Sequence, residues 1–304
     1  MRDGLYRSTF EDVVVMAPCL VTDTFLLKQV KIESEVAIIK CGQISSDVSG
    51  REFKADARPM NMCLGSESGG REAAVHPHDT YADICSRICG SVFSIDAARR
   101  PPLPPQAPFN WNVVAEGAFL RSCDYVVNCY IGAGSKLINS RLMHSYLADE
   151  VTVVRRRDAS AARVKRYVVR KAPEVVEATI THCIMELGTK ATDGCNVKRS
   201  VLMESASVVD QARVSESVLG PDASVGGGEC AHSLMGPMTG FHHQCLVIAT
   251  LWPMGRGNLA YVNMCSSTPL RLYRFSPLSR WYTSMCLVPV LTDTPTGPLP
   301  LNCS

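Results

Sequence analysis

A six-residue period in the large apolar side chains constrains the fold of this chain more than any other feature. Three ladders of such side chains run along the sequence, with a slip by one residue in the third ladder before Leu219. A helix of 3.6 residues per turn or a simple alternating strand does not favour a strict period of six. The rungs are Val14, Leu20, Leu26, Ile32, Ile38 and Ile44; Val113, Phe119, Tyr125, Ile131, Leu137 and Met143; and Leu202, Val208, Val214, Leu219, Val225 and Ala231.

A column of small residues accompanies the two later ladders, two positions before the rungs. A chain that coils around a triangular prism explains both patterns, because each face points one apolar side chain inward and each corner leaves little space. One coil cannot bury its inner face alone, so the coils must stack and pair like strands. The sequence therefore predicts a mainly β protein, a parallel β-helix of hexapeptide repeats; the alternative is a set of β-hairpins with chance spacing. The small residues are Gly117, Cys123, Cys129 and Ser135, and Ser200, Ala206, Ala212, Ser217 and Ala223.

Breaks in the ladders divide the chain into four predicted regions. Residues 1–45 form a first β-helical segment, and residues 46–110 form an insertion with a proline-rich loop at 99–108. Residues 111–261 form the main β-helical segment, and residues 262–304 form an irregular proline-rich tail. The proline-rich loop is interpreted as a surface excursion, with a ligand for a proline-binding groove as the alternative.

The stretch at 155–171 interrupts the main segment with eight basic side chains and one acidic side chain. It is interpreted as a solvated loop, and the alternative is a local patch for an anion or nucleic acid. No series of aromatic residues accompanies it for base stacking, and the net charge of the whole chain is only +2. We therefore expect no nucleic-acid partner.

Composition and apolar patterning place the chain among globular proteins. No apolar run reaches the roughly 18 residues that a membrane span needs, and the start of the chain lacks the apolar stretch of a signal peptide. We expect a soluble, cytoplasmic protein without a membrane partner. The 14 cysteines contain no C-x-x-C pair, so buried or incidental thiols are expected rather than a metal site or a disulfide framework.

Three stretches resemble a known family. They read LLKQVKIESEVAIIKCGQIS at 26–45, LGSESGGRE at 64–72, and GECAHSLMGPMTGFHHQCLVIATLWPMGRGN at 228–258. They are similar to an uncharacterised family of long proteins with left-handed β-helices, a domain of unknown function. The resemblance covers about Leu5 to Tyr261 and implies the left-handed hexapeptide-repeat fold. The chain departs from the family's pattern after about residue 262, so a truncated or altered relative is expected there.

The segment at 236–244, GPMTGFHHQ, is the first candidate site. Histidine titrates near neutral pH and can take a proton from a hydroxyl or an amine, so His242 or His243 is a candidate general base. Left-handed β-helix acyltransferases, which the fold resembles, place such a base in a cleft between subunits. Neighbouring residues of a strand face opposite ways, so at most one of the two would face that cleft. Glu229 and His232 are candidates to orient the base; the alternative is a pair of corner or surface histidines.

The segment LWPMGRGN supplies a second candidate site, for ligand binding. Arg256 can bind phosphate with two hydrogen bonds, and Trp252 offers a stacking face. Together with Asn258, they would suit a nucleotide or a sugar phosphate. A stiff turn with an anchoring tryptophan is the alternative.

Two functions remain open from the sequence. The first is a transferase that acts on a nucleotide sugar or another phosphorylated small molecule, with acyl-coenzyme A as donor and a homo-oligomer as its form. The second is a non-catalytic β-helical scaffold or assembly protein whose flat faces bind a partner or another copy. Fold analogy alone does not decide between them.

Overall fold

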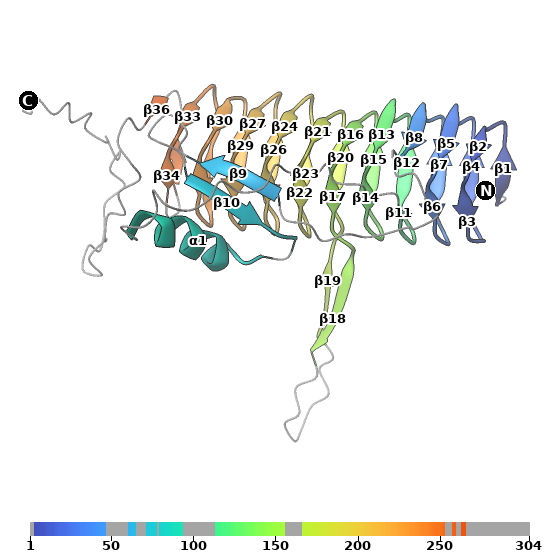
Figure 1. Ribbon diagram of the computed structural model, residues 1–304, viewed down its shortest axis with the longest axis horizontal. Coiled ribbons are helices and arrows are strands. Elements are labelled where there is room, and N and C mark those ends of the chain that lie inside the picture. The colour runs from blue at the N-terminus through green and yellow to red at the C-terminus, as the bar shows by residue number, and fades with distance from the viewer. Residues whose placement is uncertain are drawn as a thin grey trace, which may run out of the picture.

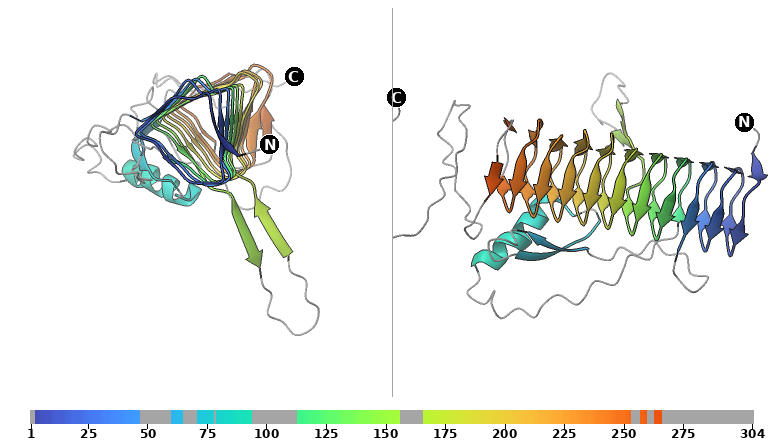
Figure 2. Two further views of the ribbon diagram at one scale, coloured as in Figure 1. Left: turned by 90° about the vertical axis from the view of Figure 1, so that its right-hand side faces the viewer. Right: turned by 90° about the horizontal axis from the view of Figure 1, so that it is seen from above.

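The computed structural model is a long parallel β-solenoid (Figure 1). The structure describes residues 3–46, 60–64, 71–77, 79–93, 113–155, 166–252, 257–259 and 263–265. Three parallel sheets form the sides of a triangular prism, and each coil contributes one short strand to each side (Figure 2). The predicted mainly β, coiled architecture is thus confirmed, with about 11 turns.

The strands of the three sheets follow one another in strict rotation along the chain. Sheet A contains β1 (Gly4–Tyr6), β4 (Leu20–Thr22), β7 (Ala37–Ile39), β12 (Phe119–Arg121), β15 (Lys136–Ile138), β20 (Glu174–Val176), β23 (Lys190–Ala191), β26 (Ser207–Val209), β29 (Ser224–Gly226), β32 (Thr239–Phe241) and β35 (Gly257–Leu259). Sheet B contains β2 (Phe10–Glu11), β5 (Leu26–Lys28), β8 (Gln43–Ser45), β13 (Tyr125–Val127), β16 (Arg141–Met143), β21 (Thr179–Thr181), β24 (Asn196–Lys198), β27 (Arg213–Ser215), β30 (Glu229–Ala231), β33 (Leu246–Ile248) and β36 (Asn263–Cys265). Sheet C contains β3 (Val14–Val15), β6 (Lys31–Ile32), β11 (Val113–Val114), β14 (Tyr130–Ile131), β17 (Tyr146–Leu147), β22 (Ile184–Met185), β25 (Val201–Leu202), β28 (Val218–Leu219), β31 (Leu234–Met235) and β34 (Leu251–Trp252).

The inward-facing side chains form one continuous apolar core along the prism. The third ladder is confirmed from Leu202 to Val225, because each of its first five rungs is fully buried. Several rungs of the earlier ladders are displaced by one residue. Tyr125 and Met143 are exposed, whereas the neighbouring side chains of Val126 and Leu142 are buried.

The same displacement affects the start of the first ladder and the end of the third. Val14 is exposed and Leu26 is half-buried. In this part of the ladder the core is filled by residues one position after a predicted rung, such as Val21 and Leu27. Cys230, rather than Ala231, stacks on Val214 and Val247 in the register of sheet B. The reason is the length of a coil. Where no insertion intervenes, a strand residue pairs with one 16 or 17 positions further along, as Leu20 does with Ala37, whereas three steps of six would require 18.

The predicted column of small residues is confirmed as buried except at Gly117, which is exposed while the neighbouring Ala118 is buried. Cys123, Cys129, Ser200, Ala212 and Ser217 are all buried. Two serine hydroxyls of this column bridge successive coils: Ser200 accepts from the backbone nitrogen of Ser217 at 3.2 Å, and Ser217 accepts from that of Ser233 at 3.1 Å. The cysteines that the structure describes are free thiols.

The described part of the insertion at 46–110 packs on the solenoid, which the sequence pattern did not predict. Strands β9 (Met60–Leu64) and β10 (Arg71–Val75) form an antiparallel hairpin, and helix α1 (Tyr81–Phe93) follows it (Figure 1). Met60, Met62 and Ile84 are fully buried in a second apolar cluster with outward-facing residues of sheet C. The sheet C side of that cluster comprises Tyr146, Ile184, Val201, Val218 and Leu234. The proline-rich loop at 99–108 lies outside the described residues.

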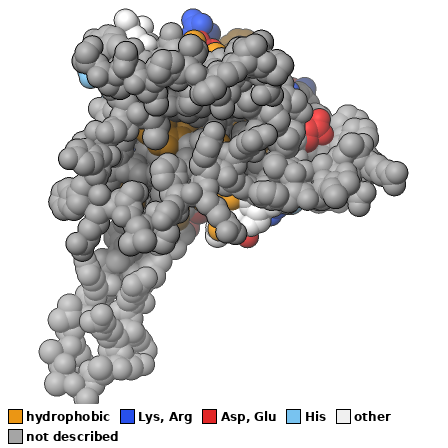
Figure 3. All heavy atoms as spheres, turned by 90° about the vertical axis from the view of Figure 1, so that its left-hand side faces the viewer, with side chains coloured by type: hydrophobic (Ala, Val, Ile, Leu, Met, Phe, Trp, Pro, Cys, Tyr) orange, Lys and Arg blue, Asp and Glu red, His pale blue; other side chains and the backbone are white. Residues whose placement is uncertain are grey.

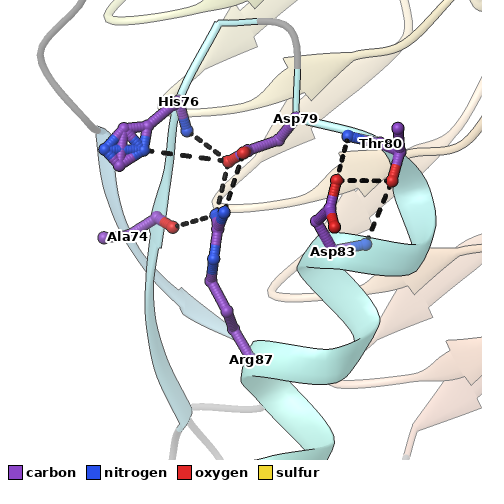
Figure 4. A network of polar contacts seen from close by, with 6 residues as sticks. All are labelled: Ala74, His76, Asp79, Thr80, Asp83 and Arg87. Carbon is purple, nitrogen blue, oxygen red and sulfur yellow. Dashed lines mark hydrogen bonds and ion pairs between the residues drawn. The ribbon is translucent and has the colours of Figure 1, made fainter.

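Polar contacts fix the start of α1 and join it to the hairpin (Figure 4). The Thr80 hydroxyl accepts from the backbone nitrogen of Asp83 at 3.2 Å, and the Asp83 carboxylate accepts from the Thr80 backbone nitrogen at 3.0 Å. This reciprocal pair is a capping box. Arg87 binds the Asp79 carboxylate with two nitrogens and donates to the Ala74 carbonyl of β10 at 2.8 Å.

Two further segments differ from the sequence-based expectation. At the two ends of the basic stretch at 155–171, which was interpreted as a solvated loop, β18 (Val151–Arg155) and β19 (Arg166–Arg170) pair as an antiparallel hairpin that projects away from the prism, and residues 156–165 lie outside the described residues (Figure 1). Strand β36 lies inside the predicted irregular tail, so the tail is regular at Asn263–Cys265.

When the solenoid is viewed from its C-terminal end, hydrophobic side chains are visible near the middle (Figure 3). None of the helices in the described part of the chain has the length and apolarity needed to cross a membrane.

Candidate functional site

Three successive corners between sheets A and B line an open hollow of about 830 Å³ near the C-terminal end of the solenoid. The corners follow strands β26, β29 and β32, so the chain passes the same place three times. Each passage contributes polar groups because a corner points its side chains to solvent. The polar and charged residues that line the hollow include Asp210, Arg213, Glu229, His242, His243 and Gln244.

The corners owe their sharp turn to left-handed backbone conformations. Asp210, Gly227 and His243 have φ values of 55°, 60° and 67°. Glycine adopts this region freely and aspartate and histidine more readily than most residues. Backbone bonds then stack one corner on the next: the Gln244 nitrogen donates to the Gly227 carbonyl at 2.7 Å. The hollow is therefore built on the regular hydrogen bonding of the solenoid.

His242 lies half-buried against the preceding coil. Its Nε2 is 3.5 Å from the hydroxyl oxygen of Ser224, and its Nδ1 lies above Gly226. A Cβ at position 226 would be 2.4 Å from Nδ1, so only glycine leaves space for this ring. The position of the imidazole thus depends on a residue 16 positions earlier in the chain.

His243 is exposed and lines the same hollow as His242. The two ring centroids are 6.3 Å apart in an edge-to-face arrangement. The expectation that at most one ring could face a common cleft assumed that both residues lie on a strand. Because β32 ends at Phe241, both histidines belong to the corner, and the strand rule does not apply to them.

Glu229 and Arg213 lie opposite each other on neighbouring strands of sheet B, at the rim of the hollow. Both side chains are exposed. The hollow therefore combines two imidazoles, the carboxylates of Asp210 and Glu229, and one guanidinium. Imidazole and carboxylate can exchange protons with a substrate, and a guanidinium can bind phosphate or carboxylate. His232, also a candidate to orient the base, lies instead at a corner between sheets B and C, where its Nδ1 donates to the Cys63 carbonyl at 3.1 Å.

The second predicted constellation is not gathered at this hollow. Trp252 lies on sheet C, in register with Met235, and packs half-buried against the main apolar core. Asn258 lies on β35 of sheet A, in register with Gly240. Arg256 lies outside the described residues. The structure thus brings together Glu229 and the two histidines but places Trp252 on another side of the prism.

The sequence reasoning missed Arg213 and Asp210. Both lie two coils before the histidines, Asp210 at the equivalent corner and Arg213 at the start of β27, the strand that follows it. A repeat of 16 or 17 residues, applied backwards from His242, would have reached Gly226 and then Asp210. Among the described residues, no group of three His, Cys, Asp or Glu side chains is arranged to hold a metal ion.

No known relative assigns a role to these residues. No family model matches the chain, and neither a curated protein nor a solved structure is similar to it. The candidate site is therefore argued from its geometry.

Proposed function

We propose that the hollow between sheets A and B is the site of a transferase that acts on a nucleotide sugar or another phosphorylated small molecule. The observation that supports this proposal is the convergence of Glu229, His242 and His243, residues from two coils, with Arg213 on one hollow. Corner residues with a purely structural role would not need to bring histidine, glutamate and arginine side chains together at one place.

The proposed reaction is acyl transfer from acyl-coenzyme A. His242 takes the proton from an acceptor hydroxyl or amine, and the acceptor oxygen or nitrogen forms a bond to the acyl carbon. The carbon–sulfur bond breaks, and the coenzyme A thiolate leaves and receives the proton from the imidazolium. Arg213 binds the phosphate of the acceptor, and Glu229 orients the histidine. His243 is the second candidate base.

A direct assay is the formation of acylated product from acetyl-coenzyme A and a panel of nucleotide sugars, followed by mass spectrometry. A positioned general base contributes about 10²–10⁴-fold to the rate, so His242→Ala or His243→Ala removes most turnover. Arg213→Ala mainly raises KM, because its contact with phosphate exists in the ground state as well as in the transition state.

The matched control is His232→Ala, which removes a corner histidine on the other side of the prism. This variant should keep its turnover. Absence of product from every donor and acceptor pair would reject the transferase, as would equal turnover in the parent and both histidine variants.

A scaffold is the second candidate function, and the outer face of sheet C favours it. This face packs against the hairpin β9–β10 and α1 through a continuous apolar cluster. The solenoid thus offers a flat surface on which other elements can assemble. A chain with no turnover that still binds a partner through such a face would support this function.

Two finer proposals rest on the sequence resemblance: the coil is left-handed, and the chain belongs to the uncharacterised β-helix family. Two others rest on different arguments: the cytoplasmic location on the apolar patterning of the sequence, and the homo-oligomer on the transferase proposal. Circular dichroism does not fix the coil's sense, so an experimental structure at side-chain resolution is the test of the handedness.

A further inference from the structure

The N-terminal end of the solenoid exposes a cross-section of its apolar core. Leu5 and Phe10 occupy inward positions of the first described coil, in register with Val21 and Leu27 of the second. The two second-coil residues are fully buried, but Leu5 is 49% exposed and Phe10 is 36% exposed. Val15, the third inward residue of this coil, is half-buried. In the left view of Figure 2, this end of the triangular prism faces the viewer.

The same three residues direct their backbone groups away from the solenoid. Strands β1, β2 and β3 are the terminal strands of their sheets among the described residues. In β1, the Gly4 nitrogen donates to the Cys19 carbonyl and the Tyr6 carbonyl accepts from the Asp23 nitrogen, so both bind the second coil. Successive residues of a strand alternate their direction, and the N–H and C=O of Leu5 therefore point outward along the axis.

The neighbouring strands repeat this arrangement. The carbonyls of Thr9 and Glu11 accept from the second coil, which leaves Phe10 between them pointing outward. The nitrogens of Val14 and Met16 donate to the second coil, which leaves Val15 pointing outward. Each side of the triangle thus presents one residue with its side chain toward the core and its backbone groups toward the free edge.

We propose that a second copy of this chain covers this end, in a twofold-symmetric, end-to-end dimer. A twofold axis through Leu5, perpendicular to the solenoid, places β1 antiparallel to β1 of the second copy. The same operation exchanges sheets B and C, so β2 lies antiparallel to β3 of the second copy. The strand lengths fit this operation, because β1 has three residues with Leu5 at its centre, while β2 and β3 have two residues each.

The register agrees in side-chain direction and in hydrogen bonding. Leu5 faces Leu5 of the second copy, and Phe10 faces Val15 of the second copy. Every opposed pair joins two inward side chains, so the two apolar cores become one. Every pair also joins two residues whose N–H and C=O point outward, which is the condition for a hydrogen-bonded antiparallel pair.

A second copy fits this end better than a single peptide strand. An added strand can pair with only one side of the triangle and would leave the core open at the other two. Another triangular coil of the same size satisfies all three edges at once. A self-complementary surface of this kind is what a twofold dimer requires. The proposal is independent of the proposed transferase, whose hollow lies near the opposite end.

Sedimentation equilibrium of the full chain tests the dimer. We expect twice the mass of one chain at micromolar concentration. Leu5→Pro should raise the dissociation constant about 100-fold or more, because it removes the N–H at the centre of the interface and places a ring there. This N–H does not bind the second coil, so the folded monomer keeps its hydrogen bonds. Leu5→Arg, which places two charges opposite each other, should have the same effect.

The control is Phe25→Ser, which removes the most exposed apolar side chain in the described residues, at 76% exposure, without changing the free edge. This variant should remain dimeric. Small-angle X-ray scattering distinguishes the mode of association: an end-to-end dimer has the cross-section of one solenoid and about twice its length. A monomeric parent, a dimer unaffected by both Leu5 substitutions, or a dimer with a doubled cross-section would each overturn the proposal.

Discussion

Replacing Val208 by aspartate tests whether the stacked apolar column carries the stability of the solenoid. Val208 is fully buried on β26, between Ala191 and Val225 of the neighbouring coils. Loss of the buried valine side chain costs about 1.5–3 kcal/mol. An aspartate there has no charged partner, so at pH 7 it is more favourable for it to take up a proton than to remain ionised.

The protonation sets the larger part of the effect. Neutralising a carboxyl with a pKa near 3.9 at pH 7 costs about 4 kcal/mol, at 1.36 kcal/mol per pH unit. Together with the lost valine, the substitution should lower the free energy of unfolding by about 6 kcal/mol. At pH 4.5 the neutralisation costs only about 0.8 kcal/mol. The difference between parent and variant should therefore shrink by about 3 kcal/mol on acidification.

Urea denaturation at the two pH values measures both quantities. With a slope of about 3 kcal/mol per molar, the variant's midpoint should lie about 2 M below that of the parent at pH 7 and about 1 M below it at pH 4.5. The control is Ser207→Asp, on the outward face of the same strand and in register with Lys190, which should leave the midpoint nearly unchanged. Equal midpoints for Val208→Asp and the parent at pH 7, or a gap that does not depend on pH, would refute the reasoning.

Three further predictions follow from individual residues. Burial, together with the nearby His144, lowers the pKa of His182 to about 4, so the unfolded chain binds its proton first as the pH falls. Because of His182, the free energy of unfolding should decrease as the pH falls from about 6.5 to about 4. The variant His182→Gln should lack this contribution to the pH dependence, which urea midpoints of the parent and the variant measure. Ile84→Ala should weaken the packing of α1 on the solenoid by about 2–5 kcal/mol. Limited proteolysis should then cut the insertion sooner than in the parent, while the β-sheet circular dichroism is retained. Gly226→Ala should displace the His242 ring, whose Nδ1 would be 2.4 Å from the new Cβ, and should change the NMR chemical shifts of that ring with little change in the thermal midpoint.

The coil could be predicted from the sequence because its inward residues recur with a short period. The exact rungs could not all be predicted, since a coil of 16 or 17 residues does not contain three equal steps of six. At Tyr125–Val126 and Leu142–Met143 two large apolar residues are adjacent. Only the pairing with neighbouring coils decides which of them fills the core.

The docked insertion was outside the reach of the ladder analysis, although local signals for it exist. Thr80 and Asp83 have the spacing of a capping box, which predicts a helix start at Tyr81. The outward apolar residues of sheet C, such as Ile184 and Val201, precede their inward neighbours directly. Two apolar residues in succession on a strand indicate a side of the prism that is covered on both faces.

The candidate site could be predicted in part. The histidine pair and Glu229 are visible as residue types, but their common position depends on stacking across coils. Arg213 enters the hollow only through its register with Glu229. Trp252 shows the opposite case, because an aromatic side chain that looks suited to a ligand contributes to the core instead.

A thermal-shift measurement with acyl-coenzyme A compounds and nucleotide sugars tests the proposed function of the hollow most directly. A ligand that binds only the folded chain raises the unfolding midpoint by mass action. We predict an upward shift for at least one of these anionic ligands, reduced or lost in Arg213→Ala and retained in His232→Ala. An unchanged midpoint with every ligand, or a shift that Arg213→Ala leaves intact, would contradict the assignment of the hollow as a binding site.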